Sequence, residues 1–142
     1  MTREIKFRAK SLDGIWEYGE LHLRCNHPHI HNLIGAKIYI ESNTVGQFTS
    51  LYDKNGKEIY EGDILVRRVI NDGWGTHDKE PLEVVFMNGA FGIRLDRGKV
   101  YEEFEWICKE HSWSSMGASG ETKYEYEVIG NIYDNPELLK EN

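Results

Sequence analysis

Five side chains that can bind metal ions lie within ten residues of this sequence: His22, Cys25, His27, His29 and His31. Imidazole and thiolate groups are donors that Zn²⁺ accepts, and imidazole also suits Ni²⁺. In an extended strand, alternation would place His27, His29 and His31 on one side. The spacing matches no established zinc motif, however, and Pro28 disfavours a regular strand. The favoured interpretation is a solvated histidine-rich loop over residues 24–32, and the alternative is a zinc or nickel site.

Glu61 and Asp63 are the carboxylates whose spacing comes closest to an acid–base pair. Two residues apart in a strand, they would share a face, and such a pair needs the two groups to differ in proton affinity. No His, Lys or Ser is spaced nearby as a partner. We therefore expect Gly62 and Asp63 to form a bend in which Asp63 accepts backbone amides. Nucleophile elbows, phosphate loops and dinucleotide motifs are also absent, so no catalytic residue is predicted.

Lys6, Arg8 and Lys10 form one face of the expected first strand and could contact nucleic acid. Charged strand faces are more often solvent-exposed, and the nearest aromatic ring, Phe7, points the other way. The chain carries a net charge of −7, and residues 61–142 hold 9 Lys+Arg against 17 Asp+Glu. A sequence-independent DNA-binding surface requires the opposite sign. We therefore expect no nucleic-acid partner.

Trp74 and Trp113 stand in expected loops among Gly and Ser residues. A large aromatic side chain in a loop either packs back on its own domain or belongs to an interface. Packing back is favoured, yet these two residues remain the best sequence evidence for a homo-oligomer.

The length of 142 residues fits a single domain, and 12% aromatic residues with 14 Gly against 3 Pro favour strands and hairpins. Cys25 and Cys108 form no paired motif, which suits a reducing compartment. The sequence shows neither a signal peptide nor an apolar stretch long enough to span a membrane. We therefore expect a cytoplasmic protein without a membrane partner.

Hydrophobic periodicity predicts a mainly β protein, either all-β or α+β, with a small antiparallel N-terminal unit over residues 1–45. Its expected strands are 4–10, with Ile5, Phe7 and Ala9 on one face, 15–23 and 33–40, with Ile34, Ile38 and Ile40 on one face. Residues 46–142 are expected to form a second unit, with an SH3-like barrel over 46–133. Its expected strands are 47–52, 57–60, 64–70, 82–87, 90–95, 100–109 (strand preferred over helix) and 124–133.

The connections of this second unit follow from turn chemistry. Asn55 and Gly56 can both adopt the positive φ of a tight hairpin turn, and Asn88 and Gly89 give a second such signal. Residues 71–81 and 110–123 are expected to be loops. Asn135 and Pro136 suit the start of a short terminal helix over 136–140.

The stretch QFTSLYDKNGKEIYEGD over residues 47–63 resembles the phage and prophage family named after YopX. The similarity rests on Gln47, on the Asp53, Asn55 and Gly56 turn, and on Gly62 and Asp63. It extends to Ile5–Ala9, to Glu127–Tyr133 and to Asn135–Leu139, and therefore covers nearly the whole chain. Lys10 stands where the family has an aromatic residue. Ser50 stands where it has glycine, so a close backbone approach there is in question.

The resemblance implies a protein made in the cytoplasm of a bacterial host, in a family with no established activity. We expect a non-enzymatic binding or assembly module that forms homo-oligomers or engages a host or phage protein. One alternative is a metal-binding protein or metal-dependent enzyme that uses the His22 to His31 cluster. Another is a nucleic-acid-binding barrel.

Overall fold

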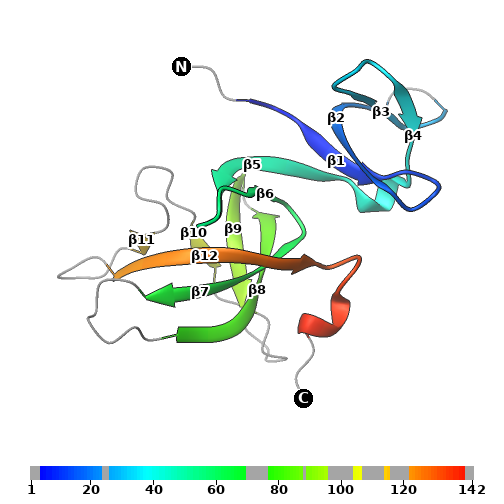
Figure 1. Ribbon diagram of the computed structural model, residues 1–142. Coiled ribbons are helices and arrows are strands. Elements are labelled where there is room, and N and C mark those ends of the chain that lie inside the picture. Colours follow the sequence, from blue (N-terminus) through cyan, green and yellow to red (C-terminus); the bar gives the residue numbers. More distant parts are fainter. Residues whose placement is uncertain are drawn as a thin grey trace. The chain divides into compact units, whose positions relative to one another are not determined.

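A computed structural model describes residues 4–23, 26–69, 77–87, 89–95, 104–106, 114–115 and 122–139 (Figure 1). These residues form antiparallel strands and two short 3₁₀ helices, which confirms the prediction of a mainly β protein. Two compact units, residues 1–50 and 51–142, make up the chain.

The N-terminal unit is a small curled sheet. It contains β1 (Phe7–Lys10), β2 (Trp16–His22), β3 (His29–Asn32), β4 (Lys37–Tyr39), the 3₁₀ helix η1 (Ser42–Thr44) and the first part of β5 (Gly46–Tyr52). The strand order is β4-β3-β2-β1-β5. The start of β1 pairs with β5, whereas Ser11, directly after β1, forms a bridge with Ile40, directly after β4. The sheet therefore curls until its β4 edge meets the end of β1.

Alternation along these strands separates an inner apolar face from an outer polar one. Ala9, Ile30 and Ile40 form the buried core, and Leu21 and Val45 pack against it. These residues alternate with histidines and cations, as a half-buried strand requires.

The C-terminal unit contains the end of β5, strand β6 (Glu58–Tyr60), which pairs with β5, and a separate six-stranded sheet. Its other elements are β7 (Asp63–Val69), β8 (His77–Met87), β9 (Ala90–Leu95), β10 (Phe104–Trp106), β11 (Ser114–Ser115), β12 (Thr122–Asn131) and the 3₁₀ helix η2 (Pro136–Leu139). The order of the sheet is β10-β9-β8-β7-β12-β11. Its core consists of Ile59, Leu65, Leu82, Val84, Ile93 and Tyr126. No pairing between the two edge strands, β10 and β11, is present among the described residues, so the SH3-like barrel stays a prediction.

Asp53 organises the hairpin between β5 and β6. Its Oδ1 accepts hydrogen bonds from the backbone N–H groups of Asn55 and Lys57 at 2.8 and 2.9 Å. Its Oδ2 accepts one from the Val128 N–H at 3.0 Å. Only Gly56, at φ 80°, has a positive φ in this turn, so the expectation for Asn55 was wrong. The turn is a three-residue loop ending in a left-handed glycine, and Asp53 caps it.

Several expected boundaries were wrong. Residues 29–32 form a strand rather than a loop, and the strand expected over 33–40 is confined to 37–39, with Ile34 exposed in the preceding turn.

Strand β8 begins at His77, inside the expected loop 71–81. It contains Pro81, which a strand tolerates at a bulge, and the β7–β8 register does shift nearby, between Leu65 and Arg67. Ser114–Ser115 is a short strand within the expected loop 110–123. The terminal helix is 3₁₀ over 136–139.

Candidate metal centre

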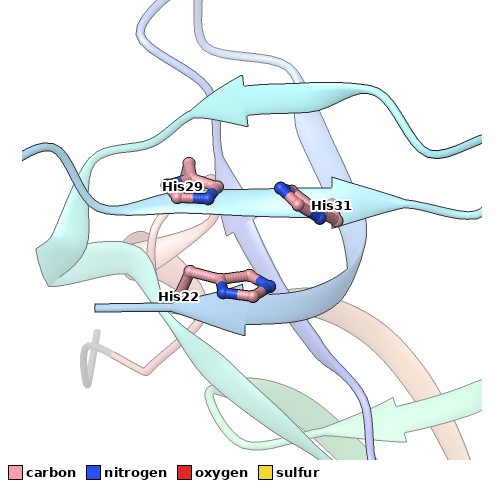
Figure 2. Close-up of side chains that lie close together, drawn as sticks. All are labelled: His22, His29 and His31. Carbon is pink, nitrogen blue, oxygen red and sulfur yellow. The ribbon is translucent and has the colours of Figure 1, made fainter. Parts of the chain in front are cut away.

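Three of the five predicted ligands meet on the outer face of the β2–β3 ribbon. His22 lies opposite His29 across the two strands, and His31 follows two residues later on the same side of β3. The residues between them, Leu21 and Ile30, form the next cross-strand pair and face the core. Figure 2 shows the three rings gathered over one face of the ribbon, His22 from β2 and the other two from β3.

The rings are close enough to share one ion. The ring centroids of His22 and His31 are 4.4 Å apart, those of His22 and His29 4.9 Å, and those of His29 and His31 5.0 Å. One nitrogen from each ring lies within 4.8 Å of the others. A tetrahedral zinc ion with Zn–N bonds of about 2.0–2.1 Å sets its nitrogen ligands about 3.3 Å apart. Rotation of the His22 and His31 rings would shorten these separations, because all three side chains already share one face.

A backbone hydrogen bond fixes the orientation of the His29 ring. Its Nδ1 lies 3.1 Å from the carbonyl oxygen of His27. A carbonyl only accepts, so Nδ1 carries the proton, and in the neutral ring the lone pair is on Nε2. Metal-binding histidines are commonly oriented by such a bond from the other ring nitrogen. His29 is also 7% exposed, so its ring is held by packing.

His22 carries a buried ring nitrogen that the described residues leave unsatisfied. Its Nε2 makes no hydrogen bond to them. Glu20 Oε1 lies 3.4 Å from this nitrogen but is not aligned as a hydrogen bond. Glu20 is the cross-strand partner of His31 and shares the outer face with the three histidines. A carboxylate oxygen of Glu20 is therefore placed to act as the fourth ligand, beside the three imidazole nitrogens.

His27 and Cys25 are the two predicted ligands that the structure does not add to this cluster. The His27 ring lies 5.7 Å from that of Tyr39 in an edge-on arrangement, and Cys25 is outside the described residues. On strand β4, which pairs with β3 on the side away from β2, Lys37 lies opposite His31. Its Nζ lies over the Tyr39 ring, 5.4 Å from the ring centroid. The ammonium group is therefore held by an aromatic face beside the cluster.

The cations Arg8 and Lys10 of β1, and Lys6 just before it, are packed on aromatic rings. The Arg8 guanidinium lies 4.7 Å and the Lys10 Nζ 5.6 Å from the Trp16 ring centroid, and the Lys6 Nζ lies 5.1 Å from that of Phe48. Arg8 is 5% exposed, so the expectation of a solvent-exposed basic face was wrong for this residue. Neighbouring strands supply the rings, which alternation along β1 alone could not reveal. Cation–π contacts occupy ring faces that a nucleic-acid base would need for stacking.

Glu61 and Asp63 have different roles. Asp63 is 1% exposed, and its Oδ2 accepts a hydrogen bond from the Tyr60 N–H at 2.8 Å. Glu61 lines a surface pocket with residues of β8 and β9. The interface candidates Trp74 and Trp113 lie outside the described residues.

Comparison with known proteins places this architecture in a family. The family described as YopX protein matches residues 6–140. This chain belongs to the YopX family. The match includes both histidine-bearing strands and the capped β5–β6 hairpin.

Among solved structures, the YopX-family chain is similar to the crystal structure of protein EF1440 from Enterococcus faecalis. The two share 24% sequence identity with a TM-score of 0.51 over 98% of this chain and 100% of the other. This similarity supports the fold alone. No curated protein matches the chain. In the described part of the chain, no helix has the length and apolar character needed to cross a membrane.

Proposed function

We propose that this YopX-family protein binds a divalent transition-metal ion, Zn²⁺ or Ni²⁺, through His22, His29 and His31. The observation that carries the proposal is the convergence of three imidazole rings, with one nitrogen each within 4.8 Å of the others. Three imidazoles make a donor set that suits zinc and nickel. The buried Nε2 of His22 adds support, because a metal ion would satisfy it.

The site is best suited to binding rather than catalysis. Glu20 can close the coordination sphere as a fourth ligand, and a zinc ion with four protein ligands has no open position for a substrate. The ion would join β2 to β3 and so stabilise the N-terminal unit. Metal binding of this kind contributes directly to folding stability, because the unfolded chain does not hold the ligands together.

Elemental analysis and calorimetry test this proposal. Tag-free protein, purified without chelators, is expected to retain zinc or to bind one equivalent on titration. Saturation to 100 times the dissociation constant should raise the unfolding free energy by about 2.7 kcal/mol. The variants His22→Ala and His31→Ala should each lose this binding.

His27→Ala is the matched control, because this histidine is in the same segment but its ring contacts Tyr39. Its main-chain carbonyl, which orients His29, is unaffected by the substitution. Zinc binding that survives in His22→Ala and His31→Ala, or that is lost equally in His27→Ala, would refute the triad as the site.

A second candidate is the non-enzymatic assembly module expected from the sequence, in the form of a homo-oligomer. Leu33 and Ile34, at the turn between β3 and β4, are 91% and 89% exposed. Adjacent apolar side chains at a hairpin tip favour contact with a second copy. Light scattering is expected to show a larger particle for wild type than for a Leu33→Ser, Ile34→Ser double variant. A wild-type monomer at high micromolar concentration rules this candidate out.

A further inference from the structure

A cationic side chain lies beside the proposed metal site, on the same face of the sheet. Strand β4 pairs with β3 so that Lys37 is opposite His31. The next pair along these strands, Ile38 and the core residue Ile30, faces the interior. Because successive side chains of a strand point to opposite faces, Lys37 shares the outer face with the histidines.

Tyr39 holds the Lys37 ammonium group next to the histidine cluster. The Lys37 Nζ lies 5.4 Å from the centroid of the Tyr39 ring, and this ring is edge-on to the His29 ring at 6.4 Å. Attraction between an ammonium group and a ring face restricts the flexible lysine side chain to this side of the sheet. Among the described residues, no carboxylate forms an ion pair with Lys37. Its positive charge is therefore not neutralised within that part of the chain.

Opposite charges flank His31 in one cross-strand row. Glu20 lies opposite His31 on β2, and Lys37 lies opposite it on β4. Glu20 attracts a metal dication and is placed to bind it, whereas Lys37 repels the same ion. Paired residues of neighbouring strands have Cβ atoms about 4.5–5.5 Å apart, so the ammonium group lies within roughly 10 Å of an ion bound by His31. The Debye length is also about 10 Å at 0.1 M salt, so the repulsion is only partly screened.

The site is open to solvent. The side chains of His22 and Glu20 are 36% and 74% exposed. An ion therefore reaches the three rings without opening of β2 and β3, and its occupancy is set by the charges around it as well as by its ligands.

These observations give Lys37 a role that rests on the metal site proposed above. We propose that the Lys37 ammonium lowers the affinity of the His22, His29 and His31 site for its dication. At about 8–10 Å, with the dielectric constant of water and little salt, repulsion between a dication and an ammonium group weakens binding about three- to sixfold. Lys37 is not a ligand, and it acts on the ion through space.

Zinc calorimetry of the full-length Lys37→Leu variant in about 10 mM salt tests this role. Leucine removes the charge without offering a ligand atom, so the dissociation constant should fall about three- to sixfold relative to wild type. The two proteins should differ by less than about twofold in 1 M salt, where the Debye length is about 3 Å. An effect of side-chain packing alone would not disappear with salt in this way.

Lys37→Arg is the matched control, because it keeps the charge and a guanidinium group also stacks on aromatic rings. It should bind zinc with wild-type affinity at both salt concentrations. Melting temperatures of the zinc-free proteins establish that each variant is folded.

Three outcomes would overturn the role of Lys37 while leaving the metal site intact. These are unchanged or weaker zinc binding by folded Lys37→Leu at low salt, equally strengthened binding by Lys37→Arg, and a difference that persists in 1 M salt. A wild-type protein that binds no zinc would instead refute the metal site, and this inference with it.

Discussion

At the residue scale, Ser50 holds a backbone conformation that glycine accepts more easily. Its φ is 71°, the one positive value for a non-glycine residue in the described part of the chain. Its hydroxyl is buried without a hydrogen-bond partner among the described residues. Ser50→Gly should raise the unfolding free energy by about 0.5–1 kcal/mol, because relief of left-handed strain exceeds the added freedom of the unfolded chain.

Chemical denaturation measures this change, with Thr49→Gly as the comparison. Thr49 is a buried neighbour on the same strand, and its φ is not positive. The same substitution there should destabilise the protein. A destabilised Ser50→Gly variant would show that Ser50 contributes more than strain.

Asp53 is the second residue with a testable energetic role. Its two carboxylate oxygens accept three backbone hydrogen bonds, two within its own turn and one from Val128 on β12. Asp53→Asn supplies only one acceptor oxygen and should cost about 1–3 kcal/mol, and Asp53→Ala should cost more. Asp13→Asn, at an exposed turn position, should change the unfolding free energy by less than about 0.5 kcal/mol. An Asp53→Asn variant as stable as wild type would contradict this role.

At the element scale, the register between β2 and β3 decides whether the histidines meet. Gly19 lies opposite Asn32 near the start of the ladder, and a Cβ at Gly19 would overlap the His31 carbonyl oxygen. Gly19→Ala should therefore cost about 2–4 kcal/mol and weaken zinc binding, since it forces the two strands apart beside the site.

Gly14→Ala is the element-scale control. Gly14 also has a positive φ, 83°, but a Cβ there meets open space. This variant should lose only about 1 kcal/mol and bind zinc like wild type. Circular dichroism melts and zinc calorimetry measure both effects. Zinc affinity that is unchanged in Gly19→Ala would separate the metal site from the β2–β3 register.

In the sequence, the candidate donors indicated a metal site only as an alternative to a solvated loop, and they gave only part of its arrangement. Alternation correctly put His29 and His31 on one face, and it also included His27, which precedes the strand because Pro28 delays its start. His22 joins them only through cross-strand pairing. Pairing depends on turn length and register, which local periodicity does not contain. The burial of Arg8 was missed for the same reason, because Trp16 lies on the neighbouring strand.

At the scale of the whole molecule, a bound metal ion should leave a local signature. Zinc is expected to slow amide hydrogen exchange in β2 and β3, because opening these strands would then require loss of the ion. The core strands β7 and β12 of the C-terminal unit serve as the internal reference. Mass spectrometry of zinc-saturated and chelator-treated protein measures the difference. Equal slowing in all strands, or none in β2 and β3, would argue against a site on this ribbon.

Anomalous diffraction at the zinc absorption edge, from crystals grown with zinc, tests the central claim most directly. The account predicts one strong peak about 2.0–2.1 Å from a ring nitrogen of each of His22, His29 and His31. It also predicts that a carboxylate oxygen of Glu20 completes the coordination. A zinc peak held by other residues, with the three rings unliganded, would contradict the account.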